Sequence, residues 1–330
     1  MRLTDIGGGL PPVSAISLGS WNTFSRITFE ENLTLIERAM DLGVNLFDVG
    51  YYWDKPHTEL IFARVLQVLA RPRDSYMVAE KLWLWDYPQQ SFLDQLKGSL
   101  LRLGLDHVDL VMVSRPLPEM DFDAFCDEVV DLVDRGLARA WGVTNWDPEQ
   151  IAHAQARLGA AGRPTPRLVQ LQYNLARRGI VETPGYDALF AAGDIHLCAA
   201  HTMEGGIIAG HLNRDRVNPS DMAAGVVPNE RNIARDAGGI RETIRENQAL
   251  LETIAKRFDA TPAQIAIATV LANPGVGTAL IGVTKVSDLE DDIGAIRLVS
   301  ERRAELLEAV EPLRLDGVAH PKRFNPHNDE

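Results

Sequence analysis

Three side chains suited to acid–base chemistry lie near the ends of two predicted strands that follow one another in the sequence. Asp48 lies near the end of the apolar run 45–50, Tyr52 comes just after this run, and Lys81 lies near the end of the run 75–83. An isolated tyrosine has a pKa of about 10, and an adjacent ammonium group lowers that pKa because it stabilises the phenolate. A carboxylate such as Asp48 would hold the ammonium group in place.

A tyrosine in this setting could protonate a carbonyl oxygen while a hydride reaches the carbonyl carbon. Asp48, Tyr52 and Lys81 are therefore candidate catalytic residues for a carbonyl reduction. The residue types alone leave an alternative open, which is a salt bridge at the rim of the fold with an exposed tyrosine.

The elements that must position these residues form a regular series. Eight short β-rich runs alternate with longer segments whose apolar residues recur at helical spacing. The predicted strands are 13–21, 45–50, 75–83, 108–114, 138–145, 167–174, 195–200 and 278–284. Eight strands, each followed by a helix, predict an α/β fold in which one parallel sheet closes on itself, a (β/α)8 TIM barrel.

The whole chain, residues 1–330, is predicted to be one barrel domain, because α/β barrels reach this size as single units. Residues 1–13 are predicted to form a short hairpin before the first barrel strand. Residues 204–245 follow the seventh strand, and this long loop is expected to be functional or mobile.

Active sites of α/β barrels lie at the carboxyl ends of the strands. Asp48, Lys81 and Ser114 lie at or near the ends of strands two, three and four. The later strands bring further polar residues to the same end, namely Thr144, Asn145, Gln170, His201 and Lys285.

Aromatic residues are concentrated at the same end. Five of the six tryptophans lie at or just beyond predicted strand ends, and Tyr51 joins them. We expect these side chains to line a flat-walled substrate pocket suited to aromatic rings or sugar faces. The candidates are Trp21, Tyr51, Trp53, Trp83, Trp85 and Trp146. Packing beneath loops is the alternative for each of them.

The composition restricts the classes of partner. A net charge of −13 repels phosphate backbones and anionic membranes, so we expect a small-molecule substrate and neither nucleic acid nor membrane as partner. Two cysteines, Cys126 and Cys198, provide no disulfide framework and no metal-ligand spacing. The amino-terminal residues show no leader pattern, and the chain is expected to be cytoplasmic. These patterns leave the oligomeric state open.

Six segments resemble those of one enzyme family. They are LFDVGYYWDKPHTELIFARVL, LRLGLDHVDLVMVSRP, GLARAWGVTNW, LVQLQYNL, TPAQIAIATVLANPGV and LIGVTKVSDLEDDIGAI. They cover nearly the whole chain in the right order, and the sequence resembles the aldo-keto reductase family. The resemblance implies NADP(H)-linked reduction of aldehydes and ketones through a tetrad of Asp, Tyr, Lys and His.

Asp48 and Lys81 match the family's tetrad, but two positions differ. Trp53 occupies the tyrosine position, and its indole N–H donates a hydrogen bond without giving up its proton. The adjacent Tyr52 is the expected proton donor, with Tyr51 as a less favoured choice. Ser114 stands where the family has histidine, and its hydroxyl can orient an oxygen but cannot carry the charge of an imidazole.

The resemblance also implies contacts with the cofactor. Thr144, Asn145 and Gln170 match positions that hold the nicotinamide carboxamide. The remaining candidates are His201, Lys285 and Asp291. Of these, His201 follows the position where an aromatic ring usually stacks, and a simple rim histidine is its alternative. NADP(H) is the expected cofactor, with NAD(H) possible.

Some charged residues near the implied cofactor site would disfavour binding of the cofactor phosphates, and others would favour it. Asp291 and Asp292 occupy a pair of positions expected to face adenine, and Asp288 lies where the 2′-phosphate approaches. These carboxylates would repel that phosphate. Four arginines in the long loop either clamp a pyrophosphate or belong to a solvated loop, and they are Arg214, Arg216, Arg231 and Arg235.

The alternation of side chains along the strands yields one structural prediction. Glu80 and Arg115 should point outward from adjacent strands, and we predict that they pair.

The departures from the tetrad leave three functions open. The first function is a nicotinamide-dependent reductase of a carbonyl or conjugated small molecule. The second is a redox-neutral lyase, dehydratase or isomerase, which needs no cofactor. The third is a catalytically quiet barrel that senses a cofactor or binds a partner.

Overall fold

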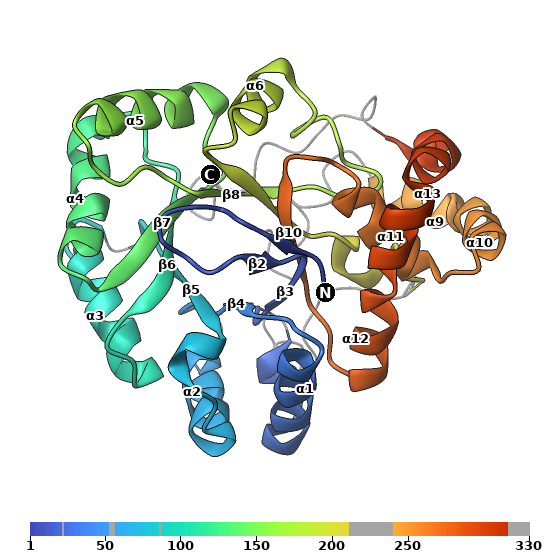
Figure 1. Ribbon diagram of the computed structural model, residues 1–330, viewed down its shortest axis with the longest axis horizontal. Helices are drawn as coiled ribbons and strands as arrows, with labels where there is room; N and C mark the ends of the chain where they lie inside the picture. The colour runs from blue at the N-terminus through green and yellow to red at the C-terminus, as the bar shows by residue number, and fades with distance from the viewer. Residues whose placement is uncertain (22, 53–56, 86, 211–239, 316–330) are drawn as a thin grey trace.

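The computed structural model describes residues 1–21, 23–52, 57–85, 87–210 and 240–315 (Figure 1). The chain begins with a separate antiparallel hairpin of β1 (Leu3–Thr4) and β2 (Val13–Ser14), in which Leu3 pairs with Ser14. The predicted first strand, 13–21, is therefore divided: its first two residues belong to the hairpin, and the barrel strand begins at Ile16.

Eight parallel strands form a closed barrel in the order β10-β3-β4-β5-β6-β7-β8-β9, which confirms the predicted TIM barrel. The strands are β3 (Ile16–Gly19), β4 (Leu46–Asp48), β5 (Met77–Leu82), β6 (Val108–Ser114), β7 (Ala138–Thr144), β8 (Leu168–Gln172), β9 (His196–Ala200) and β10 (Val276–Ile281). Each lies within or close to a predicted run.

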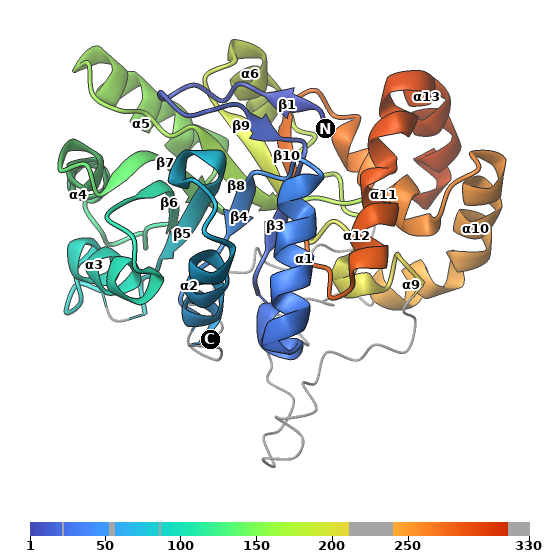
Figure 2. The ribbon, with the colours of Figure 1, turned by 60° about the horizontal axis from the view of Figure 1, so that its bottom comes forward.

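Helices surround the barrel on its outer side (Figures 1 and 2). They are α1 (Phe29–Asp41), α2 (Thr58–Leu69), α3 (Phe92–Leu103), α4 (Phe122–Asp134), α5 (Pro148–Ala160), α6 (Pro184–Ala192), α9 (Ile240–Glu246), α10 (Gln248–Arg257), α11 (Pro262–Leu271), α12 (Val286–Ile293) and α13 (Ala295–Val310). Short 3-10 turns are η1 (Phe24–Arg26), η2 (Arg73–Ser75), η3 (Glu204–Gly206) and η4 (Glu311–Leu313).

Local sequence explains where several helices begin. Thr28 and Glu31 form a capping box at the start of α1, and Thr261 and Gln264 form another at the start of α11. Such boxes satisfy backbone N–H groups that have no partner within the helix. The Ser91 side chain accepts a hydrogen bond from the backbone of α3 in the same way.

Two hydrophobic regions fill the fold. The larger lies between the strands and the helices, and the smaller lies inside the barrel near the amino ends of the strands. Ile6, Leu10 and Val13 of the hairpin segment pack in the smaller region against Leu46 and Met77. The hairpin thus closes the amino-terminal end of the barrel, and lies across it in Figure 1. The polar strand ends lie at the opposite end.

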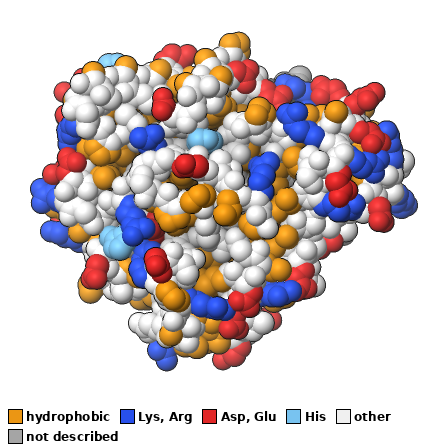
Figure 3. Space-filling model, in the orientation of Figure 1, with side chains coloured by type: hydrophobic (Ala, Val, Ile, Leu, Met, Phe, Trp, Pro, Cys, Tyr) orange, Lys and Arg blue, Asp and Glu red, His pale blue; other side chains and the backbone are white. Residues whose placement is uncertain are grey.

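The face that carries the hairpin has positive and negative side chains interspersed around its rim (Figure 3). None of the helices in the described ranges has the length and apolar character needed to cross a bilayer.

Candidate active site

The centre of the candidate site is the carboxylate of Asp48, the last residue of β4. Its side chain is almost fully buried and accepts hydrogen bonds from three directions. Lys81 Nζ on β5 lies 2.5 Å from one oxygen, and Gln170 Nε2 on β8 lies 2.7 Å from the same oxygen. The Tyr52 hydroxyl donates to the other oxygen at 3.3 Å. The structure therefore brings the three predicted acid–base residues together.

Strand alternation explains why these side chains meet. Leu46 and Asp48 point into the barrel from β4, while Phe47 between them belongs to the outer core. On β5, Met77 and Ala79 lie in the barrel interior, so the alternation brings Lys81 to the same side.

A glycine allows Tyr52 and Lys81 to approach each other. A Cβ placed on Gly50 would lie 2.8 Å from Cγ of Lys81 and 3.5 Å from Cζ of Tyr52. A side chain at residue 50 would therefore displace the stem of Lys81. The sequence shows a glycine between Asp48 and Tyr52, but the reason for a glycine at this position becomes clear only from the position of Lys81 on β5.

The electrostatics of Tyr52 differ from the sequence-based expectation. Burial raises the pKa of Tyr52 well above its usual value, and the negative charge of Asp48 raises it further, while a hydrogen bond with Ser20 acts in the opposite direction. The expected net lowering of this pKa is wrong, because burial and the charge of Asp48 raise it and the ammonium group of Lys81 is bonded to Asp48, which itself faces the phenol. Tyr52 remains a neutral, protonated phenol at physiological pH.

Ser114 lies at the end of β6, as expected, and is buried. Its hydroxyl donates a hydrogen bond to the Leu82 carbonyl oxygen at 3.4 Å. Ser114, Thr144 and Gln170 are register partners across β6, β7 and β8, so they form one row across the barrel wall.

Two residues at the carboxyl end of β7 have features that suit ligand binding. Thr144 Oγ1 is buried and has no hydrogen-bond partner among the described residues. Asn145 follows with a φ of 62°, in the left-handed region that few non-glycine residues adopt. Such uncommon backbone conformations occur preferentially at functional sites. An unpaired buried hydroxyl at a strand end fits the amide group of a nicotinamide ring.

The other candidate cofactor residues lie at separate places in the structure. His201, with a φ of 55°, places its ring edge-on to Trp21 at 6.0 Å. Lys285 is exposed at the N-cap of α12. Asp291 accepts hydrogen bonds from the Thr261 hydroxyl at 2.6 Å and from Gln264 Nε2 at 3.1 Å, so its carboxylate also holds the start of α11.

Four aromatic side chains form a chain beside the acid–base residues. The Tyr52 ring lies 6.2 Å from the Trp21 ring and 6.0 Å from the Trp83 ring. The Trp83 and Trp85 rings stack at 4.4 Å. These predicted pocket residues are thus adjacent to the candidate proton donor.

Two other predicted pocket residues turn away from the acid–base residues. Trp146 is fully buried, its Nε1 donates to the Ser114 carbonyl at 3.1 Å, and its ring packs against Phe122 of α4. Tyr51 turns outward, with its ring 4.8 Å from the guanidinium carbon of Arg102 on α3. These two pocket assignments are wrong because loop residues beyond a strand end do not keep the strand's alternation.

The predicted pair of Glu80 and Arg115 is also wrong. Arg115 forms an ion pair with Asp147 at 2.7 Å. Glu80 points outward as expected, but accepts hydrogen bonds from backbone N–H groups. Five predicted residues lie outside the described residues, and they are Trp53, Arg214, Arg216, Arg231 and Arg235.

Sequence inspection missed Cys198 on β9. Its buried sulfur lies 3.8 Å from Gln170 Nε2, and the two residues are register partners. Burial, with a smaller effect of the charge on Asp48, raises the pKa of Cys198 to about 12, so the thiol is neutral. Strand alternation could have identified it as an inward-facing residue.

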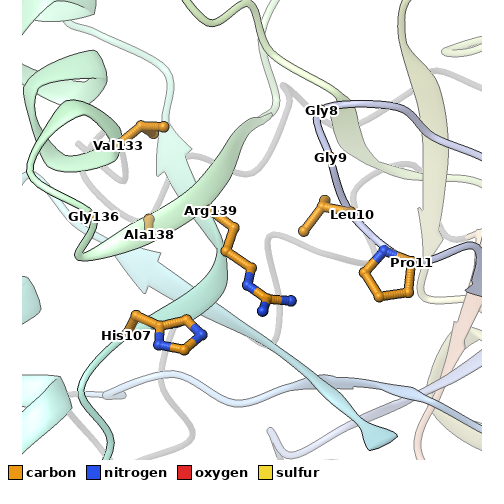
Figure 4. A pocket seen from close by; sticks show the side chains of 9 residues that line it. All are labelled: Gly8, Gly9, Leu10, Pro11, His107, Val133, Gly136, Ala138 and Arg139. Atoms are coloured by element: carbon orange, nitrogen blue, oxygen red, sulfur yellow. The ribbon is translucent and has the colours of Figure 1, made fainter. Parts of the chain in front are cut away.

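A groove of about 620 Å³ lies at the other end of the barrel (Figure 4). The turn of the hairpin forms one wall, and the Arg139 side chain extends between this wall and His107. His107 precedes β6, and Arg139 is the second residue of β7. This amino-terminal end usually serves stability in α/β barrels, and the groove is separate from the candidate active site.

Comparisons with known proteins agree with this architecture. Two curated relatives are each 25% identical to the chain. The first is a putative voltage-gated potassium channel subunit beta of Schizosaccharomyces pombe, for which the match covers 91% of this chain and 90% of that protein. The second is a probable voltage-gated potassium channel subunit beta of Arabidopsis thaliana, for which the match covers 98% of this chain and 100% of that protein.

Among solved structures, the thermostable aldo-keto reductase Tm1743, in complex with the inhibitor epalrestat, matches with a TM-score of 0.71 and 21% identity. The match covers 95% of this chain and 100% of that chain, and at this identity it shows a shared fold. The model of the Aldo/keto reductase family matches residues 15–311. Since this match extends over most of the chain, the chain belongs to the aldo/keto reductase family.

Proposed function

We propose that the chain is a nicotinamide-dependent oxidoreductase that reduces a carbonyl or conjugated group of a small molecule, with Tyr52 as the proton donor. The observation that supports this most directly is the convergence of the Tyr52 hydroxyl and the Lys81 ammonium group on Asp48. Membership of the family supports the same general class of reaction.

Each acid–base residue has a distinct task in this proposal. Tyr52 carries the proton, because its raised pKa keeps the phenol protonated at physiological pH. The alkoxide formed by reduction is a far stronger base than a phenolate, so proton transfer from even this weak acid is favourable. Lys81 stabilises the resulting phenolate, and Asp48 keeps the ammonium group within reach. The Ser114 hydroxyl orients the substrate oxygen.

The proposed cofactor is NADP(H) or NAD(H), which supplies the hydride when bound. Thr144 fits the nicotinamide amide group because its buried Oγ1 has no hydrogen-bond partner within the described part of the chain. Asn145, Gln170, His201 and Lys285 are proposed to contact the cofactor from neighbouring strand ends. The negative charges on α12 disfavour an added phosphate group, and for this reason both cofactors belong in the test.

The proposed substrate has a flat, largely apolar part. Trp21, Trp83 and Trp85 lie next to Tyr52, and aromatic side chains favour ring-shaped or flat ligand surfaces. A carbonyl attached to such a group would lie near the Tyr52 hydroxyl while its apolar part contacts the indoles.

The first test is cofactor binding and turnover. Purified protein is titrated with NADPH and NADH while tryptophan fluorescence is recorded, and then assayed with aldehydes, ketones and quinones. Tyr52→Phe removes only the hydroxyl, and we expect kcat to fall by about 10²- to 10⁴-fold with cofactor affinity within about twofold of wild type.

Tyr76→Phe is the matched control, since Tyr76 lies beside Arg73 at the amino-terminal end of the barrel and should tolerate this change. Equal turnover by the Tyr52→Phe variant would exclude Tyr52 as the proton donor. Failure to bind either cofactor would overturn the oxidoreductase proposal and favour a redox-neutral lyase, dehydratase or isomerase.

A second candidate is a cofactor-sensing or partner-binding role without turnover. Two observations favour it: relatives that match over nearly the full length bear the names of potassium channel beta subunits, and Ser114 stands where the family has histidine. Cofactor binding in the titration, followed by no turnover of any substrate in the panel, would support this second role over the first.

A further inference from the structure

Glu80 links β5 to the segment that carries Tyr52. It precedes Lys81 in β5, faces the opposite side of the sheet and is fully buried. Its Oε1 accepts hydrogen bonds from two backbone N–H groups, that of Lys81 at 2.9 Å and that of Tyr51 at 3.2 Å. Because β4 ends at Asp48, the bond to Tyr51 continues the connection between the two strands where the regular strand has ended.

The side chain of Trp83, which directly follows β5, holds the same residue from its other side. Trp83 Nε1 donates a hydrogen bond to the Tyr51 carbonyl oxygen at 2.7 Å. The backbone of Trp83 is itself fixed, since Gln95 of α3 accepts a bond from its N–H and donates one to its carbonyl, each at 2.8 Å. The backbone of Tyr51 is therefore held between Glu80 and Trp83, one residue before the candidate proton donor.

We propose that Glu80 is a positioning residue that sets where the Tyr52 hydroxyl lies relative to Asp48 and Lys81. The proposal rests on the proposed function insofar as Tyr52 is taken as the proton donor. Its geometric part, the control of the Tyr51 backbone by Glu80, stands apart from any reaction.

The surroundings of Glu80 affect its protonation state. Glu59 on α2 is fully buried nearby and pairs with Arg102 on α3, whose guanidinium group also lies over the Tyr51 ring. Burial raises the pKa of Glu80 well above its usual value, and the charge on Glu59 adds to this effect. Arg102 and the two N–H bonds act in the opposite direction.

Burial and the nearby charge of Glu59 therefore favour the protonated, neutral form of Glu80. The carbonyl oxygen of a neutral acid accepts N–H bonds as an amide oxygen does. Glutamine should consequently replace Glu80 without loss of the contact, whereas leucine, of similar volume, should lose it. The inward-facing Lys81 and Asp48 complete the set of charged groups beside this position. Glu80→Leu also removes the acceptor of the Lys81 backbone N–H, whereas Glu80→Gln keeps it.

The direct test is hydrogen–deuterium exchange of the Tyr51 amide, measured on peptides that differ at this residue. We expect the wild type and Glu80→Gln to exchange at the same rate, and Glu80→Leu to exchange about tenfold faster because the acceptor is gone. Equal exchange in the wild type and Glu80→Leu would overturn the proposal.

The kinetic test uses the same variants with the carbonyl panel. Glu80→Leu should lower kcat about tenfold or more while KM stays within about twofold, and Glu80→Gln should restore kcat. A Glu80→Gln variant as impaired as Glu80→Leu would contradict a neutral acceptor. If the wild type turns over no substrate, the proposed function fails, while the exchange comparison still decides the role of Glu80.

Asp109 provides a matched control at the other end of β5. It is also a fully buried carboxyl group, and it accepts a bond from the backbone N–H of Val78 at 2.8 Å. Asp109→Asn should lower the melting temperature without changing exchange at Tyr51 or kcat. If Glu80→Leu does not fold, Glu80→Asp keeps the acid but shortens its reach, and unchanged exchange at Tyr51 in that variant would overturn the proposal.

Discussion

At the scale of single residues, the candidate site depends on one carboxylate shared by several donors. Asp48 is bonded to Lys81, Gln170 and Tyr52, so a change at any of them alters the others. The sequence identified all four as candidates, but assigned Gln170 only to the cofactor. Its bond to Asp48 spans the barrel from β8 to β4, and strand order around a closed sheet has to be known before such a contact can be inferred.

Gly50 is the residue whose replacement should disturb this arrangement most directly. In Gly50→Ala the new Cβ would meet Cγ of Lys81 at 2.8 Å and Cβ of Lys81 at 3.1 Å, and the latter atom cannot move without the backbone. We expect a loss of about 1 to 3 kcal/mol in the free energy of unfolding and a lower kcat. Urea denaturation and turnover measurements check both effects.

Gly159→Ala is the control for that variant. Gly159 lies in α5, where an added Cβ would meet only a Thr165 methyl group at 3.9 Å, and alanine favours the helix. This control should be at least as stable as the wild type. Wild-type stability and kcat in Gly50→Ala would show that Lys81 does not require the space above Gly50.

At the scale of elements, the short helix α12 carries an unusual concentration of acid. Asp292 is nearly fully buried near its carboxyl-terminal end, where the helix dipole also disfavours a negative charge. Burial raises the pKa of Asp292 to about 8, with further contributions from Asp291 and Asp288. The sequence showed the acidic run, but not which of its members the fold would bury.

Asp292→Asn should therefore stabilise the protein in a pH-dependent way. The folded pKa of about 8 lies above the unfolded value of about 3.9, so the unfolded chain loses its proton first and wild-type stability falls as pH rises through this interval. A difference of this size corresponds to at most about 5 kcal/mol, so we expect the stability advantage of the variant over the wild type to be several kcal/mol larger at pH 8 than at pH 4.

Denaturation of both proteins across this pH range measures the difference. Asp288→Asn, at an exposed position of the same helix, should change stability only slightly. A constant difference between Asp292→Asn and the wild type at all pH values would mean that Asp292 titrates normally in the folded protein.

At the scale of the whole molecule, Glu204 joins segments that are distant in the sequence. Its buried carboxylate accepts bonds from Gln172 of β8 at 3.1 Å and from Asn174 at 2.9 Å. It also forms ion pairs with Arg177 at 3.3 Å and with Arg241 of α9 at 3.6 Å. One side chain thus fixes both described ends of the connection predicted at 204–245.

Glu204→Ala should destabilise the protein strongly, because it leaves two buried guanidinium groups without this counter-charge. We expect a loss of about 3 to 5 kcal/mol in the free energy of unfolding, measured by chemical denaturation. Glu311→Ala is the comparison, since Glu311 pairs with Arg178 while its own side chain is 60% exposed, and it should cost less than about 1 kcal/mol. Similar losses in both variants would contradict a special role for Glu204.

Local sequence patterns were sufficient to predict the class of fold, the approximate positions of all eight barrel strands, and the alternation that directs Asp48, Lys81 and Ser114 inward. These features follow from the local periodicity of apolar residues, which is the same wherever in the fold these residues are buried. The resemblance to the aldo-keto reductase family, which the family model confirms, rests on the same ordered segments.

The directions of the side chains beyond the strand ends could not be predicted in this way and follow from the three-dimensional arrangement of the chain. Asn145 adopts a left-handed conformation that redirects the chain, and Trp146 enters the core. Tyr51 turns toward Arg102, while its neighbour Tyr52 reaches Asp48. Outside regular strands the alternation of side chains is lost, and the direction of each side chain depends on neighbours that are distant in the sequence.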